Sequence, residues 1–145
     1  MTDTRGCNIP DDLYYWVEKH AWARDDGSGE ITVGITDVAQ HLAARVVAIT
    51  TKKVGKVLER GQSVATVESG KWVGPVPAPV DGEVVAVNTD LAADPTLVNS
   101  DPYGAGWIVR IRPSAWDAQK SELASGTAGV EAYAAFLVAE GISCS

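Results

Sequence analysis

Residues 62–88 read QSVATVESGKWVGPVPAPVDGEVVAVN, and this stretch decides the fold. Two segments rich in β-branched residues flank a tip at Ser69–Lys71, which predicts two strands joined by a tight turn. The prolines at 75, 77 and 79 lack a backbone donor and belong at strand edges or starts, and a turn at Asp81–Gly82 opens the next strand. Glycines at 55, 61 and 82 lie on both sides of the tip, each beside a valine-rich segment. The pattern predicts two similar half-sheets that meet at a turn.

The remainder of the first 112 residues adds strands around this unit. An aromatic segment at 13–22, a turn signal at Asp25–Gly29 and alternating apolar residues at 31–35 predict a hairpin. A short amphipathic helix is predicted after Thr36, a good N-cap residue, because apolar residues recur at spacings of four. These apolar residues are Val38, Leu42 and Val46. Residues 107–112 alternate well enough to be a closing strand.

Two helices are predicted after the sheet region. Ser114, with an acidic residue three positions later, resembles a capping box and predicts a helix to about Leu123 that Ser125–Gly126 stops. The second helix ends at Gly141 and carries on one face Val130, Tyr133, Phe136 and Leu137. We therefore expect an N-terminal extension at residues 1–12, a β domain at 13–112, and C-terminal helices and a tail at 113–145.

The composition is that of one globular domain: 145 residues, 46% apolar and 21% charged. The formal net charge of −7 opposes binding to a phosphate backbone, so nucleic acid is not an expected partner. No apolar run approaches the roughly 20 residues that span a bilayer, so we expect no membrane segment and a cytoplasmic protein. In a reducing cytosol, Cys7 and Cys144 are expected to be two free thiols. A sharper hypothesis is that these thiols receive or relay sulfur or electrons.

The sequence offers little for catalysis or metal binding of its own. His20 and His41 lack a clustered thiolate or carboxylate partner, so structural or surface roles are expected and no metal site is predicted. The glycines form no phosphate loop, and no nucleophile and base are paired. Taken alone, a lysine at a turn, such as Lys71, is usually only a solvated charge. Residue chemistry therefore predicts no enzyme.

The residues around Lys71 nevertheless carry a resemblance. Val-Glu-Ser-Gly-Lys at 67–71, followed by Pro-Val-Asp-Gly-Glu-Val at 79–84, closely resembles the lipoyl-lysine hairpin and the matching strand of lipoyl carrier domains. Further motifs resemble the glycine cleavage system H protein, in the same order from about residue 15 to residue 137. They include His20-Ala-Trp22, Thr32–Asp37, Ala39-Gln40, Val46-Val47, Asn88, Leu97–Asn99 and Asp101–Trp107.

This resemblance implies a mainly β fold, a flattened barrel-sandwich hybrid of two antiparallel sheets with one short helix in its N-terminal half and two C-terminal helices. It implies lipoate joined by an amide bond to Lys71, with Glu68, Gly70 and Trp72 as hairpin context. Trp72 is expected to shield the dithiolane or to contact a partner. The implied function is a carrier without turnover of its own, because the catalytic machinery resides in its partners. These partners would be lipoate-attaching enzymes, dihydrolipoamide dehydrogenase, and either glycine cleavage enzymes or a heterodisulfide-reductase-like complex.

Several positions depart from the usual H-protein pattern. H proteins usually have an acidic residue between the counterparts of His20 and Trp22, a residue implied in holding the aminomethylated arm, and here it is Ala21. Gly70 replaces a β-branched residue and would accept a positive φ. The run Trp72-Val-Gly-Pro-Val-Pro replaces small polar residues with apolar, stiff ones. The hairpin is therefore expected to serve a different client.

These departures, with Cys7 in an N-terminal extension and Cys144, resemble the lipoate-binding proteins associated with heterodisulfide-reductase-like sulfur oxidation. The favoured hypothesis is a lipoyl arm that shuttles sulfur-bound intermediates and reducing equivalents between cytoplasmic enzymes. A glycine cleavage H protein that carries the aminomethyl group is the first alternative, and an unlipoylated interaction module is the second. Biotin at Lys71 is less favoured, because biotinyl carriers usually have methionine on both sides of the lysine, and here the neighbours are Gly70 and Trp72.

Overall fold

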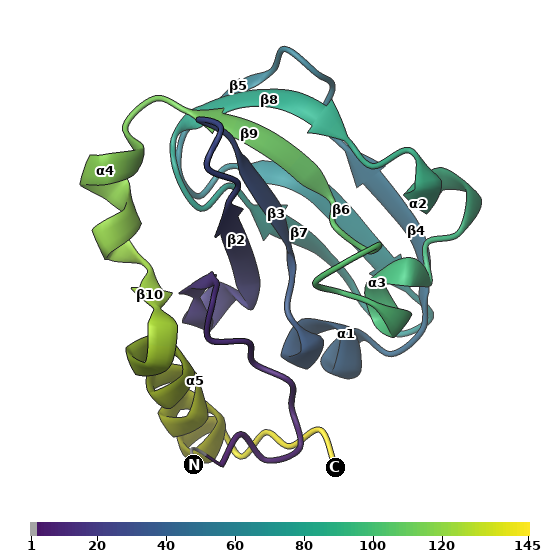
Figure 1. Ribbon diagram of the computed structural model, residues 1–145. Coiled ribbons are helices and arrows are strands. Elements are labelled where there is room, and N and C mark those ends of the chain that lie inside the picture. The colour runs from purple at the N-terminus through teal and green to yellow at the C-terminus, as the bar shows by residue number, and fades with distance from the viewer. Residues whose placement is uncertain (1–2) are drawn as a thin grey trace.

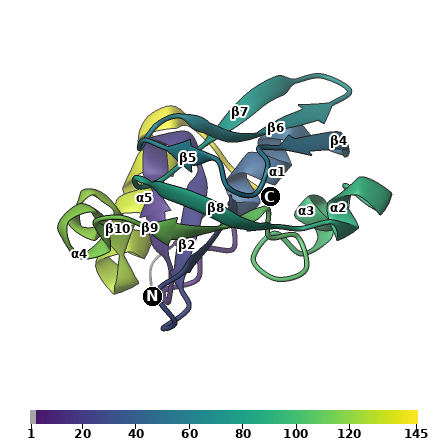
Figure 2. The same ribbon diagram turned by 90° about the horizontal axis from the view of Figure 1, so that it is seen from above.

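The computed structural model describes residues 3–145, and two antiparallel sheets form its body (Figure 1). The larger sheet has seven strands, in the spatial order β10 (Ala124–Ser125), β1 (Tyr14–Trp16), β2 (Ala21–Asp25), β3 (Ile31–Ile35), β9 (Val109–Pro113), β8 (Gly82–Val87) and β5 (Val57–Leu58). The smaller sheet has three, in the order β4 (Val46–Thr51), β6 (Ser63–Ser69) and β7 (Val73–Pro77). Figure 2 shows the smaller sheet lying over the part of the larger sheet that holds β8 and β9. This architecture confirms the predicted mainly β fold of two antiparallel sheets.

The helices lie at the edges of this body, and most of them are short (Figure 1). In chain order they are η1 (Val17–Lys19), α1 (Asp37–Ala43), α2 (Asp90–Ala93), α3 (Leu97–Ser100), α4 (Trp116–Gln119), η2 (Lys120–Glu122) and α5 (Gly126–Glu140), where η marks a 3-10 helix. No helix within residues 3–145 is long and apolar enough to span a bilayer.

The predicted N-terminal hairpin is formed by β2 and β3, and Gly27 in the turn between them has a φ of 76°, which glycine adopts at little cost. The Trp22 indole of β2 packs on Gly34 of β3, where a Cβ atom would lie 2.7 Å from the ring. The indole N–H donates to the carbonyls of Ile35 and Pro102 at 3.0 and 3.1 Å. Trp22 is thus fully buried with its one polar group satisfied.

The helix α1 begins as predicted but ends earlier. The Thr36 hydroxyl accepts a hydrogen bond from the Ala39 N–H at 3.3 Å, so Thr36 is the N-cap. The predicted apolar stripe is wrong beyond the first turn, because Leu42 is 43% exposed and Val46 lies in β4 rather than on the helix. The chain leaves the helix at Ala44, whose positive φ of 62° redirects it into β4.

The helix predicted from Ser114 to about Leu123 is wrong in its start and its length. Ser114 donates its backbone N–H to the Asp81 carbonyl at 3.1 Å and caps no helix, so only the short α4 and η2 form. Leu123 is buried in the core, and Ala124–Ser125 pairs with β1 instead of stopping a helix. The chain is extended here because strand pairing satisfies backbone groups along the outer side of β1.

The predicted buried face of the last helix forms on α5. Tyr133 and Leu137 are fully buried, and Val130 and Phe136 are partly buried against the same cluster. Gly141 ends the helix as predicted, with a φ of 67°. This face covers an apolar cluster distinct from the core between the two sheets, and the cluster includes Leu13, Tyr15, Val17, Trp22 and Val38.

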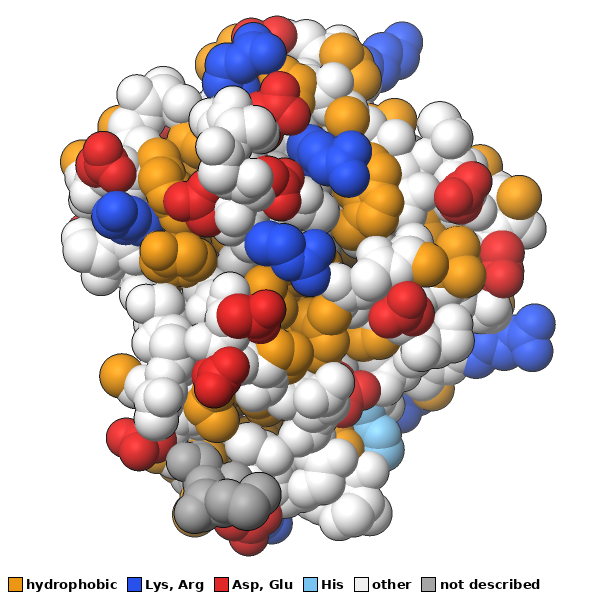
Figure 3. All heavy atoms as spheres, in the orientation of Figure 1, with side chains coloured by type: hydrophobic (Ala, Val, Ile, Leu, Met, Phe, Trp, Pro, Cys, Tyr) orange, Lys and Arg blue, Asp and Glu red, His pale blue; other side chains and the backbone are white. Residues whose placement is uncertain are grey.

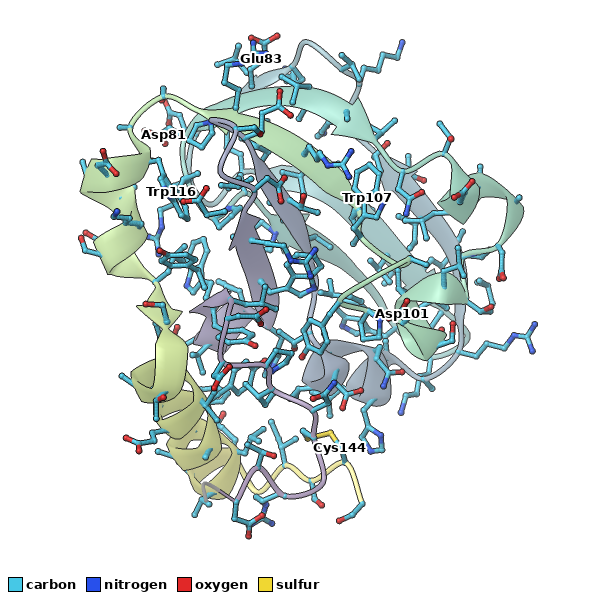
Figure 4. All side chains as sticks on the ribbon, viewed as in Figure 1. Asp81, Glu83, Asp101, Trp107, Trp116 and Cys144 are labelled. Atoms are coloured by element: carbon cyan, nitrogen blue, oxygen red, sulfur yellow. A yellow bond between two sulfur atoms is a disulfide. The ribbon has the colours of Figure 1, made fainter. Side chains whose placement is uncertain are left out.

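The two cysteines are joined to each other. Cys7 and Cys144 form a disulfide between the N-terminal segment and the tail after α5, with Cα atoms 4.9 Å apart (Figure 4). The prediction of two free thiols is therefore wrong. It rested on the expected compartment alone, whereas the fold brings the two chain ends together, as the hydrogen bond from the Cys144 N–H to the Arg5 carbonyl at 3.0 Å also shows.

Candidate functional site

The hairpin of β6 and β7 presents Lys71 at its tip. Glu68 pairs with Val73 across the two strands, and the Ser69 N–H donates to the Trp72 carbonyl at 2.7 Å. The Ser69 hydroxyl, which is buried, accepts a hydrogen bond from the Lys71 N–H at 3.4 Å. Lys71 itself is exposed, so the turn holds its backbone in place and leaves its amine in water.

Gly70 does not use the backbone freedom that glycine would allow at this position. Neither Gly70 nor Lys71 has a positive φ, and no atom of residues 3–145 lies within 4 Å of the position that a Cβ atom would take at Gly70. The capacity of glycine for a positive φ is therefore not needed at this turn. The Ser69–Trp72 hydrogen bond closes the turn with both central residues outside the left-handed region.

Trp72 lies over the second residue of β7. A Cβ atom at Gly74 would lie 2.0 Å from Cζ2 of the Trp72 ring, so the missing side chain makes room for the indole. Gly74 has no positive φ, which means that its role here is space and not backbone freedom. Trp72 remains 45% exposed. The hairpin thus places a large aromatic wall beside Lys71.

That wall bounds a cleft of about 350 Å³ next to the hairpin tip. On the β7 side, the lining residues are Trp72, Pro75 and Val76. On the opposite side, α1 contributes Ala39, Leu42 and Ala43. The polar rim consists of Glu18, Lys19 and His20. A mostly apolar cleft with a few polar groups at its rim is the kind of site that takes an apolar small group.

His20 connects the rim of the cleft to α5. Its Nδ1 hydrogen-bonds with the Tyr133 hydroxyl, which also hydrogen-bonds with Thr36 Oγ1 at 2.8 Å. Burial lowers the pKa of the His20 imidazole, and burial raises the pKa of the Tyr133 phenol. Both groups are therefore uncharged at neutral pH, and neutral hydrogen bonds hold this network together.

The hairpin of β6 and β7 carries two charged residues, Glu68 and Lys71. Glu68 is exposed, and the ion pairs formed within residues 3–145 involve neither Glu68 nor Lys71. On the face shown in Figure 3, acidic and basic side chains are interspersed. The part of the chain that the structure describes holds no group of three or more His, Cys, Asp or Glu side chains placed to bind a metal ion. Lys71 is thus an exposed amine next to a mostly apolar cleft, whose rim also carries the charges of Glu18 and Lys19.

The structure brings four of the residues singled out from the sequence together and places two elsewhere. The four at the hairpin tip are Glu68, Gly70, Lys71 and Trp72. Cys7 and Cys144 lie instead at the chain ends, where they pack on the cluster under α5.

Two features of the site were not predicted from the sequence. A glycine inside a strand often marks a place where another group approaches the backbone closely, so the position of Gly74 in the sequence could have indicated such a contact. The His20–Tyr133–Thr36 network carried none, because Tyr133 is 113 residues from His20 and 97 residues from Thr36.

Comparison with known proteins identifies the family of this chain. A model of the glycine cleavage H-protein family matches residues 13–137. The chain belongs to this family. It is 45% identical to glycine cleavage system H protein 5 of Aquifex aeolicus over 99% of each chain. It is 43% identical to probable glycine cleavage system H protein 2 of Sulfurisphaera tokodaii, over 99% of this chain and 98% of the relative.

A solved H-protein structure has the same fold. The crystal structure of a glycine cleavage system H protein from Mycobacterium marinum matches with a TM-score of 0.73 and 30% identity, over 92% of this chain and 100% of that one. H proteins are lipoyl carriers rather than catalysts, and their lipoate is covalently attached to a lysine. The predicted carrier class and the predicted cofactor are therefore confirmed. An exposed lysine amine beside an apolar cleft fits such a group.

Proposed function

We propose that Lys71 carries the lipoyl group and that the loaded arm serves the enzymes of the glycine cleavage system. The observation that carries this proposal is the place of Lys71, an exposed amine at the end of a two-stranded hairpin. A tip of this shape lets one side chain enter the active sites of several enzymes while the sheets stay outside. The names of the relatives at 45% and 43% identity favour glycine cleavage as the client.

The surroundings of Lys71 suit an apolar acyl group. When bound, lipoate supplies a disulfide that is reduced or that accepts a transferred group on sulfur. The residues of this chain orient the lysine and offer an apolar cleft, with Trp72 as one wall, for the uncharged part of the arm. Amide formation removes the positive charge of the amine, so the modified protein is more acidic than the unmodified chain.

The proposed partners are lipoate-attaching enzymes, the glycine cleavage enzymes and dihydrolipoamide dehydrogenase. Each must approach the hairpin tip, where Trp72 and Val73 are 45% and 63% exposed. Exposed aromatic and aliphatic side chains inside a polar surround are typical of protein interfaces. We place these encounters in the cytoplasm, where such enzymes act on soluble substrates.

Intact mass spectrometry tests the assignment of Lys71. After co-expression with a lipoate ligase in the presence of lipoate, the wild type should gain the mass of one lipoyl group and Lys71→Arg should gain nothing. Lys56→Arg changes another exposed lysine in the same way and should keep the modification. A biotinyl increment contradicts the proposal. An unshifted wild-type mass also contradicts it, and favours an unlipoylated interaction module.

One observation favours a second client. Ala21 is 1% exposed and uncharged, where the resemblance to H proteins leads us to expect an acidic residue that holds the aminomethylated arm. An aminomethyl group on the arm would therefore lack that acidic partner at this position. The second candidate is a lipoyl arm that shuttles sulfur-bound intermediates and reducing equivalents to a heterodisulfide-reductase-like complex.

Reconstitution distinguishes the two clients. Lipoylated protein is incubated with glycine decarboxylase and aminomethyltransferase, with and without glycine, and its mass is followed. Glycine-dependent addition of an aminomethyl group to the arm is expected and excludes the second candidate as the main function. If no addition occurs, and a heterodisulfide-reductase-like complex reduces and reoxidises the same arm, the second candidate replaces the first.

A further inference from the structure

The two ends of the chain are held together by more than the disulfide. Arg5 Nε donates to the Ile142 carbonyl at 2.7 Å, and the Arg5 carbonyl accepts a hydrogen bond from the Cys144 N–H at 3.0 Å. The Cys7–Cys144 bond lies among these contacts (Figure 4). We call this assembly the terminal junction, which comprises residues 3–7 and 142–145.

The two cysteines of the junction differ in their access to solvent. Cys7 is 4% exposed and belongs to the apolar cluster under α5. Cys144 is only partly buried and lies in the tail, next to the exposed C-terminal Ser145. Because thiol–disulfide exchange begins with attack on an accessible sulfur, a thiolate from solvent meets Cys144 before Cys7.

The N-terminal side of the junction is connected to α1 by hydrogen bonds. The Asn8 N–H donates to Asp37 Oδ2 at 2.7 Å, and the Asn8 carbonyl accepts a hydrogen bond from the Tyr103 hydroxyl at 2.6 Å. The Asp37 N–H in turn donates to the Tyr103 hydroxyl at 2.9 Å. Asp37 is the first residue of α1, and α1 forms one side of the cleft beside Lys71. The residue after Cys7 therefore braces the start of a cleft wall.

The C-terminal side of the junction leads to the same place through α5. The Ile142 N–H donates to the Leu137 carbonyl at 2.9 Å, which joins the tail to the end of α5. Tyr133, one turn earlier on α5, hydrogen-bonds with Thr36, the N-cap of α1, and with His20 at the rim of the cleft. Both chain ends are thus linked to the start of α1, one through Asp37 and the other through Thr36.

We propose that the Cys7–Cys144 bond is a thiol–disulfide exchange site whose substrate class is a dithiol, and that its redox state sets how firmly the cleft beside Lys71 is held. In the oxidised state the junction holds Asn8 at its hydrogen bond with Asp37 and, through α5, Tyr133 at its hydrogen bond with Thr36. In the reduced state the two ends separate more readily, and α1 loses part of its bracing. This proposal stands whether or not Lys71 carries lipoate.

The exchange is a two-electron reaction in two steps. One thiolate of the dithiol attacks the Cys144 sulfur, forms a mixed disulfide and expels the Cys7 thiolate, which takes up a proton. The second thiol then attacks the sulfur of the dithiol in the mixed disulfide and expels the Cys144 thiolate, which is protonated. The dithiol loses two electrons and two protons and becomes a disulfide, and the protein gains both. A dithiol is favoured over a monothiol because its second step is intramolecular.

The test uses the full chain as Lys71→Arg, so that added dihydrolipoamide is the only dithiol present. The protein is equilibrated with mixtures of dihydrolipoamide and lipoamide, alkylated with iodoacetamide and weighed. The expected result is reversible conversion from zero to two alkyl groups as the mixture becomes more reducing. Hydrogen exchange on the same samples should be at least roughly tenfold faster in residues 3–13 and α1 of the reduced form, with β6 unchanged.

Two outcomes would overturn the proposal. If no alkyl group is incorporated at a roughly hundredfold excess of dihydrolipoamide, the bond is a structural cross-link and not an exchange site. If two groups are incorporated while exchange in α1 stays constant, the bond is not coupled to the cleft. A Cys7→Ser, Cys144→Ser variant should show the fast exchange in every mixture. If that variant does not fold, the wild type reduced and capped with iodoacetamide provides the same comparison.

Discussion

The imidazole of His20 is held at the rim of the cleft in a neutral state. Its Nδ1 hydrogen-bonds with the Tyr133 hydroxyl, and burial lowers its pKa from the ordinary value near 6.5. The unfolded chain therefore binds a proton at a pH where the folded chain does not. The contribution of His20 to stability is complete above the unfolded pKa and is lost as the pH falls from there toward the lower folded pKa.

Because the pKa of His20 is lower in the folded chain, we expect the free energy of unfolding to fall at acidic pH. Substitution of His20 should remove much of this pH dependence. The wild type should lose free energy of unfolding between roughly pH 7 and pH 5, and His20→Gln should be less stable at pH 7 but should lose less over the same range. Urea unfolding at a series of pH values measures both slopes. His41→Gln, the same substitution at an exposed histidine, is measured alongside as the matched control. Equal slopes for His20→Gln and the wild type would contradict this account.

Trp72 has a large apolar side chain that is 45% exposed. An exposed indole forgoes the stability that its full burial would give, so we expect Trp72 to have a role at the surface. Trp72→Ala should cost about 1–2 kcal/mol of stability at most, since much of the indole is already exposed. We expect it to lower kcat/KM for the transfer from glycine decarboxylase to the lipoylated chain several-fold. Val73→Ala, the exposed neighbour, is the matched control for loss of apolar surface. Unchanged transfer kinetics in Trp72→Ala would dismiss a role for the indole.

At the scale of the element, the smaller sheet, which contains the hairpin of β6 and β7, has two edge strands with different features. β7 lies at the edge of the smaller sheet, and its Pro75 and Pro77 lack the backbone donors that an exposed edge would otherwise offer. The other edge strand, β4, is anchored at its start by Asn99, whose side chain accepts from the Val46 N–H at 2.9 Å and donates to the Ala44 carbonyl at 2.7 Å. Asn99 thus anchors one edge of the smaller sheet, and the prolines of β7 limit pairing at the other edge.

The same substitution, glycine to alanine, should change stability very differently at two positions of this hairpin. Gly74→Ala would place a methyl group in contact with the Trp72 ring, so the indole must move, at a cost of about 1–3 kcal/mol. Gly70→Ala meets open space at an ordinary φ and should change stability by no more than about 0.5 kcal/mol. Denaturant unfolding, together with the indole N–H resonance of Trp72, measures the difference. A displaced resonance in Gly70→Ala, or an unmoved one in Gly74→Ala, would contradict the assigned packing.

At the scale of the whole molecule, the disulfide closes almost the entire chain into one loop. Cys7 and Cys144 are 137 residues apart, and loop-closure entropy gives a stabilisation of about 5 kcal/mol as an upper value. We expect reduction to lower the free energy of unfolding by about 2–5 kcal/mol and to lower Tm accordingly. Thermal unfolding with and without reductant measures this. The Cys7→Ser, Cys144→Ser variant should unfold at the same temperature in both conditions, and a reductant-insensitive wild type would contradict the prediction.

The hairpin and the helix caps could be predicted because their signals are local. The strands on either side of Ser69–Lys71, the Thr36 N-cap and the Gly141 helix end each depend on residues a few positions apart. The helix expected to run to Leu123 was wrong for the opposite reason. Its local capping pattern was outweighed by the burial of Leu123 and by strand pairing with β1, which lies more than a hundred residues earlier in the chain.

By itself the sequence determined the strands that flank the turn at Lys71, and its resemblance to H proteins implied the two-sheet fold and the carrier class. Only the tertiary structure decided the state of the cysteines, the space that Gly74 leaves for Trp72, and the His20–Tyr133–Thr36 network. The physical reason is how far apart the interacting residues lie along the chain. Strand alternation, turns and caps are energies of neighbouring residues, whereas a disulfide or a buried hydrogen bond exists only once packing has brought distant segments together.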